Sequence, residues 1–113
     1  MVSMADVVLM KKDMGKHIEL GISDVSRNED GTLTVRWGYQ NNGTNLVRIH
    51  PDNNRLEVKK GTILLLRDLP SQLRCGSHMR DFEMVMIGDT EFTWNWFGNE
   101  FSLNSDECMK VVS

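Results

Sequence analysis

The sequence predicts an all-β domain, specifically an immunoglobulin-like β-sandwich of seven or eight antiparallel strands, with a small β-barrel as the alternative. Short segments that alternate apolar and polar residues recur along most of the chain, and turn-forming Gly, Asn and Asp residues separate them. No segment shows the 3.6-residue period of an amphipathic helix. The 113 residues are enough for one hydrophobic core and too few for two.

Residues 31–49 hold the clearest strand pattern. One face of its first arm is apolar, with Leu33, Val35, Trp37 and Tyr39. The Asn41-Asn42-Gly43 sequence then predicts a tight turn, because Gly43 can adopt a positive φ at no steric cost. The strand pattern resumes at Leu46, so we expect residues 31–49 to form a β-hairpin.

Further strands are expected where the same alternation returns. They are residues 18–22, 56–58, 62–66, 82–86, 92–96 and 101–103, with a last segment at 109–112. The Gly88-Asp89 pair predicts a turn that joins 82–86 to 92–96 in a second hairpin, and Lys59-Lys60-Gly61 predicts a turn before residue 62. Residues 62–66 are apolar on both faces, which predicts a strand buried on both sides or covered by a loop.

The N-terminal residues 1–16 have no clear pattern, although residues 7–10 fit a short edge strand. We therefore expect a single β-sandwich domain over residues 17–113. The apolar run at residues 7–10 is too short for the core of a signal peptide. No apolar run approaches the roughly 20 residues of a membrane-spanning helix, so membrane insertion is not expected.

Charge and motifs exclude several functions. The net charge is −3, which leaves no surplus of basic residues for nucleic-acid phosphates. The chain has no G-x-S-x-G elbow, P-loop or H-E-x-x-H motif, so we do not expect an enzyme. Cys75 and His78 are the one pair that could act as nucleophile and base or begin a metal site, but His17 and His50 stand apart from them. We predict no metal and no cofactor.

The two cysteines allow two interpretations. A disulfide between Cys75 and Cys108 would close a loop of about 33 residues and stabilise the fold by roughly 3 to 4 kcal/mol. Two reduced thiols, as in a cytosolic protein, fit the sequence equally well. A bond would favour export, whereas free thiols would favour a small cytosolic enzyme or regulator.

The tryptophans are the first candidate binding site. Exposed Trp94 and Trp96, beside the polar Asn95 and Asn99, could stack on sugar rings. Both indoles also alternate with other residues as core side chains do, and burial is the favoured interpretation because aromatic residues contribute the largest buried area.

A second candidate site is the loop that holds Asp52, Asn53 and Asn54. Oxygen ligands of this kind suit hard cations, but the loop lacks the spacing of a calcium loop, and Asp and Asn are common in turns. We expect this loop to be a variable surface that a partner could contact.

Several segments resemble a known family. They are W-G-Y-Q-N-N-G at 37–43, the segments at 47–51 and 53–54, G-S-H at 76–78 before Phe82, T-W at 93–94 and F-G-N at 97–99. Together, over residues 31–103, they resemble a short β-sandwich repeat of secreted and cell-surface proteins of bacteria and archaea. The chain departs from that repeat by lacking its G-Q-P-T segment and by having T-W-N-W-F-G in place of W-T-L-x-G. The resemblance implies an extracellular structural or adhesive module without catalytic residues.

These observations lead to three functional hypotheses. The first is a noncatalytic structural or protein-interaction module, part of a larger surface or secreted assembly, whose partner is another protein. The second is a carbohydrate-binding module that holds a polysaccharide on exposed tryptophan. The third is a small cytosolic enzyme or regulator.

Overall fold

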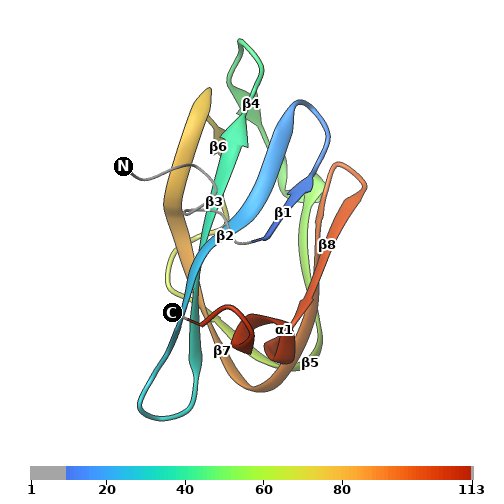
Figure 1. Ribbon diagram of the computed structural model, residues 1–113. Coiled ribbons are helices and arrows are strands. Elements are labelled where there is room, and N and C mark those ends of the chain that lie inside the picture. Colours follow the sequence, from blue (N-terminus) through green and yellow to red (C-terminus); the bar gives the residue numbers. More distant parts are fainter. Residues whose placement is uncertain (1–9, 113) are drawn as a thin grey trace, which may run out of the picture.

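The structure, a computed structural model that describes residues 10–112, is an all-β fold whose main antiparallel sheet curves into a nearly closed barrel (Figure 1). Its strands are β1 (Met10–Asp13), β2 (Ile18–Arg27), β3 (Leu33–Asn41), β4 (Val47–Arg48), β5 (Asn54–Leu65), β6 (Gln72–Leu73), β7 (Gly76–Trp96) and β8 (Asn99–Asn104). A 3-10 turn, η2 (Pro51–Asn53), precedes β5, and one short helix, α1 (Ser105–Met109), follows β8. The all-β prediction is confirmed.

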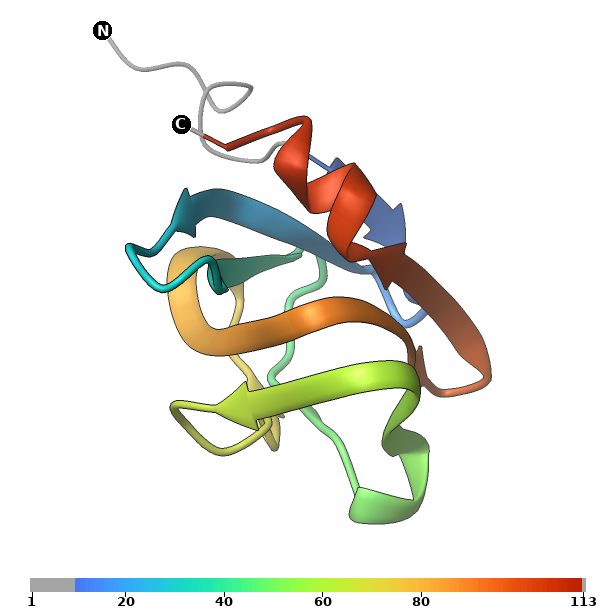
Figure 2. The same ribbon diagram turned by 90° about the horizontal axis from the view of Figure 1, so that it is seen from below.

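Strand β7, 21 residues long, organises the main sheet. Its first half pairs with β3 from Gly76 to Met86, and its second half pairs with β8 from Glu91 to Trp96. Strand β5 pairs along the other edge, and the six strands follow the order β1-β2-β3-β7-β5 with β8 added on β7. The sheet therefore curls around its own interior (Figure 2). The immunoglobulin-like arrangement of two facing sheets is not confirmed, and the barrel alternative describes this sheet better.

The predicted hairpin across Gly88-Asp89 is wrong, because β7 bends there without reversing. Gly88 has φ +73°, and the neighbouring strand β5 bends beside it at Gly61, with φ +77°. A Cβ at Gly61 would lie 2.5 Å from the carbonyl oxygen of Asp89, so only glycine fits this corner. Both strands turn together and keep their pairing, with register shifts on either side of Lys60. The predicted turn at residues 59–61 is likewise a bulge within one strand.

The predicted hairpin at residues 31–49 is also wrong. Strand β3 pairs with β2 and β7, whereas β4 pairs with β6 in a separate two-stranded sheet. The Asn41 side chain directs the chain away from β3: its amide donates to the carbonyls of Asn45 (3.0 Å) and Leu73 (2.9 Å), and its oxygen accepts from the Gly43 amide (2.9 Å). Gly43 is not among the glycines with positive φ.

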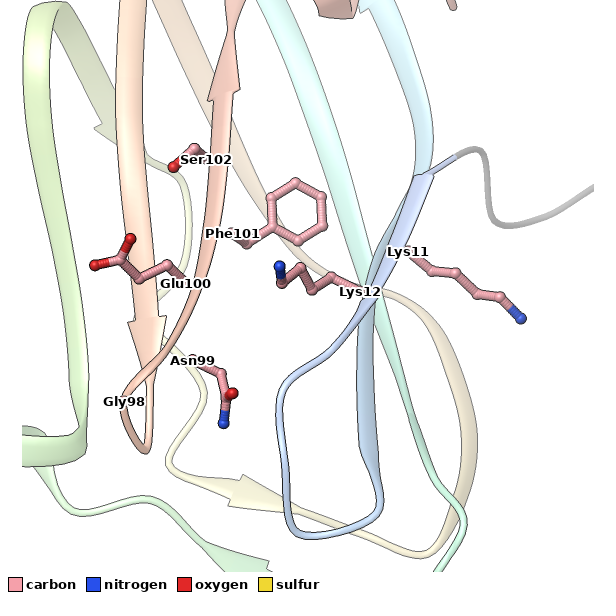
Figure 3. A pocket seen from close by; sticks show the side chains of 7 residues that line it. All are labelled: Lys11, Lys12, Gly98, Asn99, Glu100, Phe101 and Ser102. Carbon is pink, nitrogen blue, oxygen red and sulfur yellow. The ribbon is translucent and has the colours of Figure 1, made fainter.

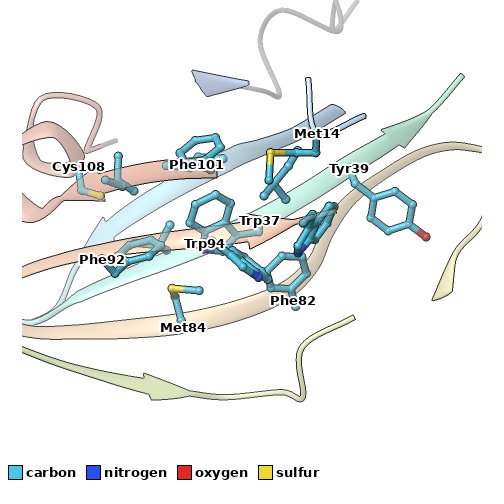
Figure 4. Close-up of a cluster of buried hydrophobic side chains, with 14 of the residues drawn as sticks. Met14, Trp37, Tyr39, Phe82, Met84, Phe92, Trp94, Phe101 and Cys108 are labelled. Atoms are coloured by element: carbon cyan, nitrogen blue, oxygen red, sulfur yellow. The ribbon is translucent and has the colours of Figure 1, made fainter. Parts of the chain in front are cut away.

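The core lies inside the curved sheet and is rich in aromatic rings (Figure 4). Trp37 occupies its centre: it is stacked on Phe82 and meets Phe92, Trp94 and Phe101 edge to face at centroid distances of 5.1 to 6.1 Å. Such pairs each contribute about 0.5–1.5 kcal/mol beyond burial. The Trp37 indole N–H is buried without a hydrogen-bond partner among the described residues. Edge-to-face rings on three sides leave little room there for a polar group.

The helix α1 was not predicted; a final strand was expected instead at residues 109–112. A capping box begins the helix: the Asn104 side chain accepts from the Glu107 amide (2.9 Å), and the Glu107 carboxylate accepts from the Asn104 amide (3.2 Å). The Thr90 amide donates to the Ser105 hydroxyl (3.1 Å), which fastens the helix to the bend of β7. The last described residue, Val112, forms an isolated parallel bridge with Val25.

Candidate binding surfaces

The expectation that the tryptophans are buried is confirmed, and the alternative, a tryptophan platform for sugar binding, is not formed. Trp94 and Trp96 are fully buried, as is Trp37. Both indole N–H groups donate to the side-chain oxygen of Asn54, Trp94 at 2.7 Å and Trp96 at 3.1 Å. Because the alternating positions of β7 point inward, these rings fill the barrel and present no face to a ligand.

Three of the predicted polar site residues do come together. Asp52, Asn53 and Asn95 line one shallow pocket of about 240 Å³ on the outer face of β5, β7 and β8. Across the pocket Arg55, Asn95 and Glu100 occupy paired positions on the three strands. Its other lining residues are Glu57, Thr93 and Gly98, so no aromatic ring faces it. The pocket is a polar sheet surface that lacks an apolar platform for a sugar.

The remaining predicted polar residues lie elsewhere. Asn54 points into the structure, where its amide donates to the Pro70 carbonyl at 2.9 Å in addition to its contacts with the indoles. The Asn99 amide donates to the Met14 carbonyl at 3.1 Å and joins the β7–β8 turn to the β1–β2 loop. Sequence reasoning grouped these residues by proximity along the chain, whereas strand alternation sends neighbours to opposite faces.

A groove lies where the barrel fails to close, between β1 and β8 (Figure 3). Its volume is about 640 Å³, and its lining residues are Lys11, Lys12, Gly98, Asn99, Glu100, Phe101 and Ser102. Lys12 points across the groove toward Phe101, and Lys11 points away from it. Phe101 is buried and belongs to the aromatic core, so the floor of the groove is the outer surface of that core.

The most apolar exposed surface is the end of β5. Of seven large hydrophobic side chains exposed in the described part of the chain, four gather here: Leu64, Leu65, Leu66 and Ile87. Leu64 is 53% exposed and Leu66 49%. The expectation that residues 62–66 are buried on both faces is therefore wrong. The reason is topological: β5 has β7 on one side and no paired strand on the other.

The free edge of β5 has a defined hydrogen-bonding pattern. The Leu66 amide donates to the Glu83 carbonyl of β7 at 3.1 Å. Because hydrogen-bonding direction alternates along a strand, Leu64 also faces β7, whereas the backbone groups of Ile63 and Leu65 face away from it. Within residues 10–112 no backbone partner is found for those outward groups. This half of β5 thus offers both apolar side chains and unpaired backbone groups.

Of the two interpretations of the cysteines, the structure has the free thiols: Cys75 and Cys108 are not bonded, the first is exposed and the second is buried. Cys108 lies 3.7 Å from the Met86 sulfur, and burial raises its pKa to about 12. Cys75 immediately precedes Gly76, ten strand residues from Met86, which corresponds to about 30 Å of extended chain. A bond needs Cα atoms within about 7 Å, so this geometry excludes one.

Catalytic and metal-binding arrangements are not found in the described part of the chain. The imidazole Nε2 of His78 lies 2.9 Å from the carbonyl oxygen of Cys75, so the ring is engaged by backbone. No group of three or more His, Cys, Asp or Glu side chains among residues 10–112 could hold a metal ion. No helix in the same range is long and apolar enough to cross a membrane.

Comparison with known proteins identifies no relative. No protein family matches the chain, and neither a curated protein nor a solved structure matches it significantly.

Proposed function

We propose that this protein is a noncatalytic interaction module that binds an extended segment of a protein partner along the free edge of β5. The observation that carries the proposal is the coincidence of three exposed leucines, Leu64 to Leu66, with an unpaired strand edge. An added strand would gain backbone hydrogen bonds from Ile63 and Leu65 and would bury the leucine side chains.

The two halves of β5 differ in a way that supports this proposal. Exposed sheet edges usually carry charges, bulges or prolines that prevent pairing with other chains. The half before the bend has such protection, with Glu57, Lys59, Lys60 and the bulge at Gly61. The half at residues 62–66 has no charge and no proline. Such an edge is prone to nonspecific pairing with other chains unless a partner covers it.

The competing hypotheses have less support. A carbohydrate-binding module that uses tryptophan needs exposed rings, and the three indoles are buried. An enzyme would need a nucleophile or base in a cleft. The free thiol of Cys75 has no base beside it other than His78, whose ring is engaged by the backbone carbonyl of Cys75. A secreted or cell-surface location is proposed only from the resemblance to the bacterial and archaeal repeat.

Selection of extended peptides from a random display library, with the purified protein as bait, tests the proposal. Selected peptides should bind the wild type and lose at least tenfold in affinity for the Leu64→Lys/Leu66→Lys variant. Leu46→Lys, which places one lysine at an exposed leucine outside β5, is the control and should bind normally.

Amide hydrogen exchange measured by NMR gives the position of binding. A bound strand should protect the Ile63 and Leu65 amides, which face the free edge, and should leave the already paired Leu64 and Leu66 amides unchanged. Peptides that bind both variants equally and protect other amides would refute the β5 edge as the binding surface.

A further inference from the structure

We infer that a pocket between the β1–β2 loop (residues 14–17) and the β3–β4 loop (residues 42–46) binds the oxyanion group, phosphate or carboxylate, of a small molecule. The two loops lie at the same end of the barrel (Figure 1). The pocket has a volume of about 520 Å³, within the range of small-molecule sites. It shares no residue with the free edge of β5, so this activity goes beyond the binding of an extended strand.

The lining of the pocket holds basic side chains and no acidic one. Lys16 and His17 come from the β1–β2 loop, and the β3–β4 loop with its flanking residues supplies amides, a hydroxyl, a glycine and a valine. By contrast, Asp52, Glu57 and Glu100 line the pocket on β5, β7 and β8, and Glu100 also lines the groove between β1 and β8. In a chain of net charge −3, a pocket with this lining favours an anion.

The acidic residues beside the β1–β2 loop are engaged by other groups. The Asp13 carboxylate accepts a hydrogen bond from the Gly15 amide at 2.8 Å. The Glu19 carboxylate lies 3.6 Å from the Lys11 ammonium and accepts from the side-chain amide of Asn42 at 3.1 Å. Neither carboxylate is paired with a basic residue of the pocket.

Four polar side chains of the pocket are available to a ligand. Within residues 10–112 no hydrogen bond or ion pair engages the His17 imidazole, the Thr44 hydroxyl or the side-chain amide of Asn45. The Lys16 ammonium lies 5.5 Å from the centroid of the Phe97 ring, a cation–π contact that positions it. All four groups can donate hydrogen bonds, and an oxyanion is the acceptor that such donors bind most strongly.

The β1–β2 loop holds its two basic residues in an unfavourable backbone conformation. Gly15, Lys16 and His17 have φ of +81°, +56° and +64°. Glycine adopts this left-handed region freely and asparagine tolerates it, whereas lysine there is strained. Two hydrogen bonds close the loop, from the Met14 amide to the Ile18 carbonyl (2.8 Å) and from the Ile18 amide to the Gly15 carbonyl (2.9 Å). A lysine in this position therefore points to a role for its side chain rather than to the needs of the turn.

The opposite wall of the pocket is fixed to the same loop. The Asn42 backbone amide donates to the His17 carbonyl at 2.9 Å. The side chain of Asn41 contacts the backbone of Gly43 and Asn45, so both sides of the pocket are held in place. A Cβ at Gly43 would lie 3.7 Å from the His17 Cβ, and the lack of a side chain there leaves space beside the imidazole. Such preorganisation lowers the cost of binding a ligand.

NMR titration at constant ionic strength tests the site. Inorganic phosphate and citrate represent the two oxyanions, glucose is a neutral probe, and chloride measures nonspecific binding of anions. Phosphate or citrate should shift the backbone amide signals of Gly43, Thr44 and Asn45 until they saturate, whereas glucose and chloride should not. The tighter of the two anions identifies the oxyanion that the site prefers. If neither anion gives a saturable shift at these amides, the inference is wrong.

The Lys16→Asn variant separates binding from folding. Asparagine tolerates the left-handed backbone, so this variant should unfold at the temperature of the wild type or higher, while its dissociation constant for the anion rises at least fivefold. His17→Gln should also weaken binding. Lys12→Gln removes one lysine charge from the groove between β1 and β8 and is the matched control, which should bind as the wild type does.

Two results with these variants would overturn the inference. An equal loss of affinity in Lys12→Gln would show that net charge, and not the pocket, attracts the anion. Unchanged affinity in a Lys16→Asn/His17→Gln double variant would show that the anion binds elsewhere. Neither result bears on the β5 edge, because the peptide selection and the hydrogen exchange described above test that surface separately.

Discussion

The side-chain oxygen of Asn54 accepts a hydrogen bond from the indole N–H of Trp94 at 2.7 Å, and it accepts a second from Trp96 at 3.1 Å. Its amide donates to the Pro70 carbonyl at 2.9 Å. Asn54 begins β5 and pairs with Trp96 near the end of β7, so one amide group joins two strands and the loop that follows β5. A residue predicted for the surface therefore satisfies two buried donors of the core.

Asn54→Ala should lower the free energy of unfolding by about 2–6 kcal/mol, because two buried indole N–H groups lose their acceptor and each such loss costs about 1–3 kcal/mol. Urea denaturation followed by tryptophan fluorescence measures the change. Asn53→Ala, the neighbouring exposed amide, is the control and should stay within about 0.5 kcal/mol of the wild type. Equal effects of both substitutions would contradict a core role for Asn54.

Substitution of Gly61 should be more damaging than the same change at Gly76. Both have positive φ, +77° and +92°, so alanine costs about 1–2 kcal/mol of backbone strain at either. At Gly61 the new Cβ also meets the Asp89 oxygen at 2.5 Å, whereas at Gly76 no atom lies within 4 Å. Gly61→Ala should therefore lose about 1–3 kcal/mol more than Gly76→Ala in chemical denaturation. Similar losses for the two substitutions would show that the backbone at Gly61 can move away from Asp89 at no cost in free energy.

Acid should weaken the fold partly through Asp89. The Lys60 ammonium lies 2.6 Å from the Asp89 carboxylate, and this hydrogen bond lowers the pKa of Asp89 below its ordinary 3.8. Since the folded pKa is below the unfolded one, the pair stabilises the fold above about pH 4, and this is lost as pH falls through the folded pKa. Asp89→Asn should be less stable than the wild type near neutral pH, and their thermal midpoints should converge in acid. As a control, Glu29→Gln removes an exposed carboxylate far from Asp89 in the sequence. Introduced into both proteins, it should leave the convergence of their thermal midpoints unchanged.

The two thiols should differ in reactivity. Ellman's reagent at mildly alkaline pH should label Cys75 in the folded protein and both cysteines in urea, because the thiolate is the reactive form and Cys108 has a pKa near 12. Peptide mass spectrometry identifies the labelled site. Fast labelling of Cys108 in the native state would contradict its burial.

Alkali should also act through Cys108. Its pKa rises from 9.0 in the unfolded chain to about 12 in the fold, so the stabilisation by the neutral thiol is present below pH 9 and is lost as pH rises toward 12. The Cys108→Ala variant should lose less stability than the wild type over this range of pH in thermal unfolding. A parallel decline of both proteins would exclude the thiol as the cause.

The sequence by itself determined the positions of several strands and most of the side chains that those strands bury. Alternation at 33–39, 82–86 and 92–96 correctly places Trp37, Phe82 and Trp94 in the core. The F-G-N sequence at 97–99 is likewise a local turn signal, and Gly98 has φ +84° in the turn between β7 and β8. These features depend on a two-residue period and on glycine conformation, both of which are local properties of the chain.

Only the tertiary structure decided which strands are neighbours. Gly88 carries the same local signal whether the chain reverses or bends, and pairing with β5 on both sides of the bend is what makes it a corner. Likewise, the apolar run at 62–66 fits a buried strand until the sheet order leaves β5 at its edge. The binding surface proposed here, and the role of Asn54 beneath the tryptophans, follow from contacts between residues far apart in sequence. Local patterns do not encode those contacts, because strand pairing depends on the whole arrangement of the sheet.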